Sequence, residues 1–241
     1  MFEEHPHLEL TLDDSAKIWR YMSFSKFVSL LDSRALHFAR IETFDDPFEG
    51  TLPRASDELL IVNGKKLPDD EIGKIRSGLH RFTRSNVCVN CWHANEHESA
   101  AMWQLYSLSG EGIAIQSSMK SLKEALKVAA QPIFIGDVKY IDYSTETIPM
   151  QNVLQAVLRK RKSFEHEREI RCLLAVGAED GDSVARPSFG VSIPIAVDSL
   201  IEGLYVSPNV AEWFVRAVEA VCDRFGCAKK PIPGMSERPI Y

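Results

Sequence analysis

Several features that would place a protein in a class at once are missing from this sequence. Five cysteines among 241 residues are too few for a disulfide-stapled fold, and we expect reduced thiols. The first ten residues, MFEEHPHLEL, carry no basic segment and no apolar core, so they do not predict a signal peptide. No stretch approaches the roughly 18 consecutive apolar residues that would span a bilayer. These absences predict a cytoplasmic protein without a membrane partner.

The common catalytic motifs are also missing. The sequence has no glycine-rich phosphate loop, no nucleophile elbow and no HExxH zinc motif, and a turn explains the isolated pair Gly110 and Gly112. A net charge of -6 provides no general attraction to nucleic acid. An acidic protein can still carry a local basic groove, so a nucleic-acid substrate is only weakly disfavoured.

What the chain does contain is an ordinary globular composition, with 45% hydrophobic and 26% charged residues. Apolar periodicity predicts more strands than helices, with connections too irregular for repeating βαβ units. We therefore expect an α+β fold in one domain over residues 1–241, with a mostly antiparallel split sheet and flanking helices. The polar stretch 54–85 is predicted to be a variable helical insertion. Strands are expected over residues 18–23, 35–39, 86–92, 112–116, 133–140, 170–176, 188–194 and 200–206, and helices over 25–32, 99–106, 121–129, 149–166 and 210–225.

Arg20 is the first candidate site residue. It lies in the middle of a predicted strand between Trp19 and Tyr21, so its side chain points away from both aromatic rings. Burying a guanidinium is costly unless it binds an anion, and its rigid fork matches a phosphate or a carboxylate. The plainer interpretation is an arginine on the solvent face of an edge strand.

The second candidate is the segment FEHEREIRC, residues 164–172. If this segment is extended, Glu165, Glu167 and Glu169 share one face, and one of these clustered carboxylates can be tuned for catalysis. If the preceding helix continues, the same residues form a solvated charged face. The apolar run that starts at Ile170 favours a strand beginning at or just before Glu169.

The segment CVNCWHANEHES, residues 88–99, contains four residues that could bind zinc. They crowd into ten positions without a second pair of ligands, and Cys88 and Cys91 would point to opposite faces of a strand, so we expect no metal. Ser99 is expected to begin a helix and to offer its hydroxyl and backbone N–H groups to an anion or a ribose. Trp103 and Tyr106 are expected to pack in the core rather than to form a stacking platform.

Three blocks of the sequence resemble the bacterial family known as domain of unknown function 2971. They are WRYMSFSKFVSLLDSRALHFARIETFDDPFEG, CWHANEHESAAMWQLYSLSGEGIAI and KRKSFEHEREIR, and the tail LYVSPNVAEWF also fits. The order of these blocks is similar to that of the ADP-ribosyltransferase superfamily, especially the toxin and phage-defence members. Arg20 matches the arginine of the first strand, Ser99 the second motif, and the stretch that contains Glu167 and Glu169 the late-strand glutamate. The Ser-Thr-Ser triplet of the arginine-directed members is absent.

The resemblance implies an enzyme that uses NAD as substrate. Arg20 would hold the pyrophosphate, and Glu169 or Glu167 would bond the 2′-hydroxyl of the nicotinamide ribose and stabilise the cationic ribosyl group. Tyr21 or Phe44 would stack on the nicotinamide, and Glu167 would activate the acceptor. The acceptor, protein or nucleic acid, is left open, as is an antitoxin or regulatory partner.

Two other functions fit the same residues. One is a non-enzymatic interaction or sensor protein on a degenerate fold of this kind. The other is hydrolysis or nuclease chemistry on a phosphate that Arg20 binds. Whether Arg20 and Glu169 meet in one cleft should discriminate between an enzyme and an interaction protein.

Overall fold

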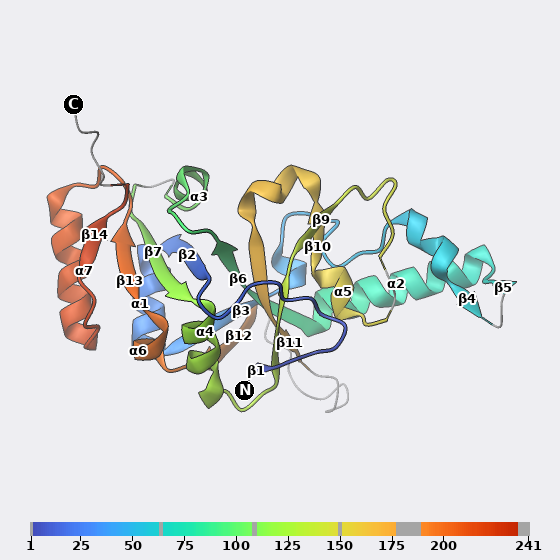
Figure 1. Cartoon of the computed structure of the whole chain (residues 1–241), viewed down its shortest axis with the longest axis horizontal. Helices are drawn as coiled ribbons and strands as arrows, with labels where there is room; N and C mark the ends of the chain where they lie inside the picture. The colour runs from blue at the N-terminus through green and yellow to red at the C-terminus, as the bar shows by residue number, and fades with distance from the viewer. Residues whose placement is uncertain (1, 63–64, 108–109, 149–150, 177–188, 236–241) are drawn as a thin grey trace.

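The computed structural model describes residues 2–62, 65–107, 110–148, 151–176 and 189–235. Most strands join one large sheet, and helices lie on both of its faces (Figure 1). The strands are β1 (Phe2–Glu3), β2 (Lys17–Ser23), β3 (Ala35–Arg40), β4 (Ile61–Val62), β5 (Lys65–Lys66), β6 (Val87–Ala94), β7 (Gly112–Ser118), β8 (Ile133–Asp137), β9 (Lys139–Ile141), β10 (Arg159–Arg161), β11 (Glu169–Ala175), β12 (Gly190–Pro194), β13 (Gly203–Val206) and β14 (Pro231–Pro233). The helices are α1 (Phe24–Ser33), α2 (Asp69–Asn86), α3 (Ala100–Tyr106), α4 (Met119–Ala125), α5 (Leu154–Val157), α6 (Val197–Leu200) and α7 (Glu212–Phe225).

The large sheet has the order β1-β8-β11-β6-β2-β7-β13-β14, and β3 and β12 branch from it at β6. All of its ladders are antiparallel except those of β1 with β8 and of β13 with β14. The expected mixed fold with a large, mostly antiparallel sheet is therefore confirmed.

One edge of β6 is shared between two strands. Its end pairs with β2, with Trp19 opposite His93, whereas its beginning pairs with β3, with Ala39 opposite Val89. The other edge of β6 pairs with β11 along the whole strand. Residues 90–92 of β6, where β2 and β3 diverge, are called the fork below.

The alternation of side chains along the strands builds two apolar layers. In β2, Ile18 and Met22 join the main core, to which α1, α4, α6 and α7 contribute. Trp19 and Tyr21 point to the opposite face and pack under α3. The aromatic residues of this strand and its arginine therefore lie on different faces, as the sequence predicts.

Helix ends follow the expected capping chemistry. The Ser23 side chain accepts a hydrogen bond from the backbone N–H of Lys26 and caps α1, the helix predicted over residues 25–32. Helix α7 ends at Gly226, whose φ of 71° is the left-handed conformation that glycine adopts without strain. The helix predicted over residues 99–106 is α3, with Ser99 as its cap.

The long helix predicted over residues 149–166 is wrong. In the described part of that range only Leu154–Val157 is α-helical; Arg159–Arg161 then pairs in parallel with β9, and Lys162–Glu167 forms a 3-10 helix. Arg168 has a φ of 43°, and this left-handed residue turns the chain into β11. Strand β11 begins at Glu169, which confirms the strand start that the apolar run predicts, whereas the alternative in which Glu165, Glu167 and Glu169 share one face of a strand is wrong.

The stretch 54–85 begins with a 3-10 helix, Arg54–Leu59, continues through the short β4–β5 hairpin and enters α2. Figure 1 shows α2 leading from the hairpin back to the sheet, with β4 and β5 at its far end. The last turns of α2 are anchored by buried Leu79, Thr83 and Asn86. That this stretch is a variable insertion stays a prediction.

None of the helices in the described ranges is long and apolar enough to cross a membrane. The five cysteines are free thiols, and Cys88 and Cys91 belong to different apolar clusters on the two faces of β6. Within the described residues, no group of three or more histidine, cysteine, aspartate and glutamate side chains is placed to hold a metal ion.

Candidate functional site

The fork leaves backbone groups of β6 without a neighbouring strand on one edge. Side-chain hydrogen bonds link the fork to the neighbouring strands instead. The Nη1 atom of Arg20 donates to the carbonyl of Cys91 at 2.7 Å, and the Nδ2 atom of Asn90 donates to the carbonyl of His37 at 2.8 Å. Arg20 is therefore held at the point where β2 and β3 separate.

Arg20 belongs to an interior strand, because β2 lies between β6 and β7. The interpretation as a solvent-facing residue of an edge strand is thus wrong. Its guanidinium lies 5.9 Å from the centre of the Trp92 ring, and burial lowers its pKa from the ordinary value. Within the described part of the chain it forms no ion pair with a carboxylate. A partly buried cation without a counter-charge is an attractive site for an anion.

A cleft of about 340 Å³ opens beside Arg20, between β2, α1 and β3. Lys26 also lines this cleft, and it too lacks an ion-pair partner among the described residues. No aspartate or glutamate is part of the lining, although the whole chain carries a net charge of -6. The volume lies at the lower end of the range for small-molecule sites, about 300–1,000 Å³. The cleft therefore fits an anionic small molecule.

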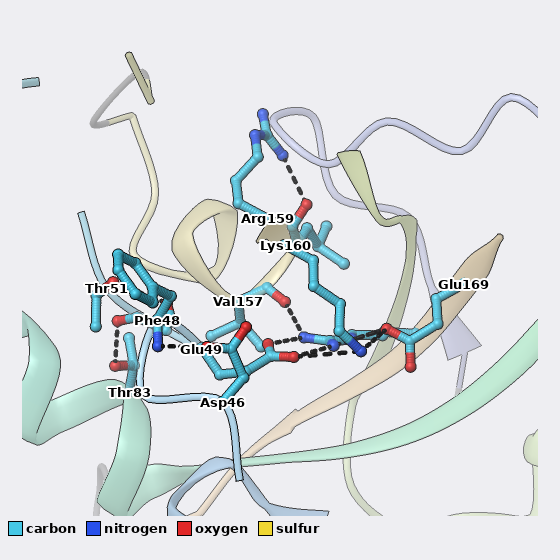
Figure 2. A network of polar contacts seen from close by, with 12 residues as sticks. Asp46, Phe48, Glu49, Thr51, Thr83, Val157, Arg159, Lys160 and Glu169 are labelled. Atoms are coloured by element: carbon cyan, nitrogen blue, oxygen red, sulfur yellow. Dashed lines mark hydrogen bonds and ion pairs between the residues drawn. The ribbon is translucent and has the colours of Figure 1, made fainter. Parts of the chain in front are cut away.

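A network of buried charges lies on the other face of the sheet, where Figure 2 shows Glu49, Lys160 and Glu169 converging. Arg171 is fully buried and bonds both carboxylate oxygens of Glu49, at 2.7 and 2.9 Å. It also donates to the Oε2 atom of Glu169 at 2.7 and 3.1 Å. Lys160 bonds Glu167 and lies 3.5 Å from Glu49 and 3.6 Å from Glu169.

The network holds three carboxylates and two cations. Its carboxyl groups have different neighbours, so their pKa values shift in different directions. Burial raises the pKa of Glu169, but the charges of Arg171 and Lys160 outweigh it and leave this pKa below its ordinary value. Burial and the neighbouring Glu169 raise the pKa of Glu167. Two nearby carboxyl groups with pKa values shifted in opposite directions are suited to different roles: Glu169 stays ionised, and Glu167 accepts a proton more readily than Glu169 does.

The loop that contains Glu49 is held in place by a hydrogen bond to helix α2. Gly50 has a φ of 71°, and its carbonyl accepts a hydrogen bond from the Thr83 hydroxyl at 2.8 Å. A side chain at this position would meet that hydroxyl, because a Cβ atom there would lie 2.8 Å from Oγ1 of Thr83. The glycine of the FDDPFEG loop therefore allows the close approach that places Glu49 in the network.

A second cavity, of about 20 Å³, is lined by Glu167 and Glu169. Three residues line both this cavity and the cleft at Arg20: Tyr21, Cys91 and Tyr106. Arg20 and the two glutamates therefore do not meet in one cleft; they line two cavities that have these three residues in common. Because Tyr106 is 45% exposed, the wall that these residues form is open to a ligand from outside.

The remaining predicted residues have mixed positions. Phe44 lines the larger cleft, and the Arg171 guanidinium lies 5.5 Å from the centre of its ring. Ser99 lines neither cavity; its side chain caps α3, and its backbone N–H donates to the Tyr21 hydroxyl at 2.8 Å. Trp103 is buried against Tyr21, as predicted, whereas Tyr106 is exposed on the cleft wall.

A larger cavity, of about 910 Å³, lies away from Arg20 and is lined by Phe48 and Tyr143 among others. Three of its basic side chains already have carboxylate partners: Arg76 with Asp57, Arg161 with Asp46, and Lys162 with Glu146. Its charge is therefore largely neutralised, whereas Arg20 and Lys26 form no ion pair with any described residue, so their cleft is the better anion site.

Sequence reasoning missed four residues of the site, namely Glu49, His93, Lys160 and Arg171. His93 is 2% exposed and lines the small cavity. Its Nδ1 atom lies 2.6 Å from the Glu167 carbonyl, and its Nε2 atom has no hydrogen-bond partner among the described residues. In the sequence, the only signal for this residue was a histidine in a strand that is rich in apolar residues.

The buried state of His93 leads to a prediction about pH. Burial lowers the pKa of His93 below its ordinary value of 6.5, so the unfolded chain binds this proton more readily than the folded chain does. The free energy of unfolding should therefore fall as pH decreases below about 6.5. The variant His93→Gln cannot titrate and should lose less stability between pH 7 and pH 5 than the wild type. Urea unfolding at a series of pH values measures this, and parallel pH curves would contradict it.

No protein-family model matches the chain, and no match was found among curated proteins, so the resemblance to domain of unknown function 2971 is not confirmed. Among solved structures, the chain is similar to DarT of Thermus sp. 2.9 in complex with NAD+, with 11% identity, a TM-score of 0.39 and coverage of 92% of this chain and 96% of that one. It is also similar to the same protein in complex with ADP-ribosylated ssDNA, with 11% identity, a TM-score of 0.42 and coverage of 94% and 97%. These values are too low for ligands or activity to be carried over.

Proposed function

We propose that this chain is an ADP-ribosyltransferase that takes NAD as its substrate. The observation that supports this most strongly is the cleft at the fork, where Arg20 and Lys26 face a space that no carboxylate lines. NAD is a dianion at its pyrophosphate, so it would supply the counter-charge that the cleft lacks. Arg20 would form charge-assisted hydrogen bonds with the pyrophosphate, as the resemblance implies.

We interpret the fork as the point where the sheet splits into two halves, with NAD lying across it. The pyrophosphate would then lie on the Arg20 side. The nicotinamide ribose would reach the wall formed by Tyr21, Cys91 and Tyr106, next to Glu169. Phe44 lines the cleft and is placed better than buried Tyr21 to stack on the nicotinamide ring.

The proposed reaction breaks one bond and forms one. The bond between C1′ of the ribose and the nicotinamide nitrogen breaks, and its electron pair leaves with nicotinamide. The ionised carboxylate of Glu169 bonds the 2′-hydroxyl and stabilises the positive charge that develops on the ribosyl group. A nucleophile of the acceptor then bonds to C1′ and gives its proton to Glu167, whose raised pKa suits a general base.

The alternative is an interaction protein without catalysis. Arg20 and Glu169 line two cavities rather than one cleft, so the one-cleft criterion does not by itself favour the enzyme. A module without catalysis, however, does not need a buried carboxylate of lowered pKa in a cavity next to the cleft of a buried cation. Groups with perturbed pKa values in adjoining cavities are typical of active sites. We therefore favour the enzyme. The cytoplasmic setting remains an expectation from the sequence. The acceptor, and any role in toxin or phage-defence systems, remain expectations from the resemblance.

The direct test is to incubate the protein with NAD labelled in its adenylate part and a cell lysate. Label that enters the protein or nucleic-acid fraction identifies the acceptor class. Release of free nicotinamide in step with this labelling would support the transfer. If the protein neither binds NAD nor releases nicotinamide, the enzyme hypothesis is wrong and the interaction protein is favoured.

Arg20→Gln is expected to weaken NAD binding about 10- to 100-fold, because charge-assisted hydrogen bonds contribute on the order of 1.5–3 kcal/mol. Isothermal titration calorimetry would measure the dissociation constant. Arg216→Gln, which removes the same charge from the exposed surface of α7, is the matched control and should bind NAD as the wild type does. Equal affinities of the two variants would show that Arg20 does not hold the substrate.

A further inference from the structure

Two cysteines lie at the C-terminal end of helix α7, five positions apart in the segment CDRFGC. Figure 1 shows this helix beside β14, at the opposite end of the molecule from α2. Cys222 belongs to the helix and is fully buried, whereas Cys227 follows the helix and is partly exposed. Neither thiol takes part in the proposed transfer of ADP-ribose.

The way in which α7 ends holds these two cysteines together. The backbone N–H of Cys227 donates to the carbonyl of Cys222 at 2.9 Å, across the left-handed Gly226. In this type of helix end the side chains of the two bonded residues commonly contact each other. Backbone dimensions keep their Cα atoms within about 7 Å, the limit beyond which a disulfide requires backbone movement. The two thiols are also hydrogen-bonded to each other. A disulfide can therefore form between them in the folded chain.

The two thiols differ in reactivity. The hydrogen bond from the Cys222 thiol lowers the pKa of Cys227, and a hydrogen bond from the backbone N–H of Lys229 acts in the same direction. The hydrogen bond to Cys227, together with burial, raises the pKa of Cys222. Burial also raises the pKa of Cys88 to about 11 and that of Cys172 to about 12. Because the thiolate is the reactive form of cysteine, Cys227 is the nucleophile of the pair.

Cys227 is also accessible to a small molecule. It lines a cavity of about 40 Å³, together with Asp198 and Lys229 among other residues. One water molecule requires roughly 10–15 Å³, so this cavity has room for hydrogen peroxide. The ammonium group of Lys229 favours the thiolate form of Cys227, whereas the carboxylate of Asp198 disfavours it. The oxidant therefore has a path to the sulfur atom that the buried Cys222 does not offer.

We propose that Cys222 and Cys227 are a peroxide-reactive pair that closes to a reversible disulfide. The Cys227 thiolate bonds to one oxygen of hydrogen peroxide, the O–O bond breaks, and the other oxygen leaves as hydroxide, which becomes water by taking up a proton. Cys227 is then a sulfenic acid. The sulfur of Cys222 bonds to that of Cys227, and the thiol proton and the sulfenic hydroxyl leave as a second water. Each sulfur loses one electron, and the peroxide gains two. A dithiol reverses the step by thiol–disulfide exchange.

Trypsin makes this disulfide visible, because it cuts after Arg224, between the two cysteines. The reduced full chain is treated with hydrogen peroxide at pH 7, its remaining thiols are blocked, and the digest is analysed by mass spectrometry without a reductant. The peptides AVEAVCDR and FGCAK should stay joined until dithiothreitol is added. Two of the five thiols should be lost. Cys227 should react about tenfold or more faster than Cys88 and Cys172, because the thiolate fraction increases as the pKa falls.

Two serine variants assign the roles within the pair. In Cys222→Ser, Cys227 still reacts but has no partner, so it should remain a sulfenic acid that dimedone traps. In Cys227→Ser, the buried Cys222 should keep its thiol under the same treatment. Cys88→Ser is the control, and its two peptides should be joined as in the wild type.

Three results with the wild type would overturn the proposal, and these decide the question even if a variant fails to fold. The first is that peroxide does not join the two peptides. The second is that Cys227 loses its thiol no faster than Cys88 and Cys172 do. The third is that the oxidised protein migrates as a linked dimer on a denaturing gel without reductant, because the disulfide proposed here lies within one chain. NAD takes no part in these measurements, so they stand apart from the test of the transferase.

Discussion

Replacing Glu169 by glutamine is expected to lower the rate of ADP-ribosyl transfer about 100- to 1,000-fold, the typical cost of removing one charge-stabilising group at a transition state. Glutamine keeps the shape of the side chain and its contact with Arg171, so substrate binding should change far less than the rate. The measurement is the initial rate of nicotinamide release and of labelling, with the NAD dissociation constant determined in parallel.

The glutamine variant should remain folded for a reason specific to this network. Glu49, Glu167 and Glu169 face Lys160 and Arg171, so the wild type has one carboxylate in excess. Removing the charge of Glu169 leaves two carboxylates and two cations. The variant is therefore expected to stay folded, with a midpoint of thermal unfolding lowered only by the lost stabilising charge of Glu169.

Two further glutamine variants make the result interpretable. Glu165→Gln removes the same charge from an exposed residue of the preceding 3-10 helix and should leave the rate unchanged. Glu167→Gln should slow transfer to the acceptor more than it slows the release of nicotinamide, because its proposed partner is the attacking nucleophile. If Glu169→Gln and Glu167→Gln both label substrates at the wild-type rate, the proposed chemistry is wrong.

The sequence predicts those parts of the fold that depend on local patterns. The alternation in β2 and the helices predicted over residues 25–32 and 210–225 each depend on neighbouring residues, and these features are confirmed. Arg20 was identified for the same reason, because a charged residue between two aromatics in a strand is visible without any tertiary information.

The buried network depends on contacts between distant segments, and local patterns cannot reveal these. Arg171 and Glu49 are 122 residues apart in the sequence, and neither has an unusual neighbour. The helix prediction over residues 149–166 was wrong for the same reason, because contacts with distant segments determine the structure there. Its charged positions are compatible with a solvated helical face, but Lys160 is buried among carboxylates that come from other elements. We infer that ion pairs between Lys160 and these carboxylates outweighed the local helix propensity.

Arg171→Met is expected to destabilise the protein by about 3–5 kcal/mol, the usual cost of removing one partner from a buried ion pair. This is a large part of the stability of a typical domain, about 5–15 kcal/mol. Methionine fills a similar volume, so the loss comes from the carboxylates of Glu49 and Glu169, which are 1% and 10% exposed and lose their main cation. Chemical unfolding at pH 7 measures the effect, and Arg216→Met, at an exposed pair on α7, is the control, with an expected change below about 1 kcal/mol.

The pH dependence of this difference identifies its cause. In the wild type the lowered pKa of Glu169 gives a contribution to stability that is present above about pH 4.5 and is lost as pH falls through the folded-state value. In Arg171→Met the carboxyl group of Glu169 lacks that cation, so burial should raise its pKa and the folded variant should bind this proton more tightly than the unfolded chain does. The stability of the variant should then increase as pH falls from 7 to 5, and its deficit relative to the wild type should shrink. The double variant Glu49→Gln/Arg171→Met, which removes a charge of each sign, should be less destabilised than Arg171→Met alone. A deficit that stays constant with pH, and that the second substitution does not reduce, would mean that lost packing rather than unpaired charge destabilises the variant.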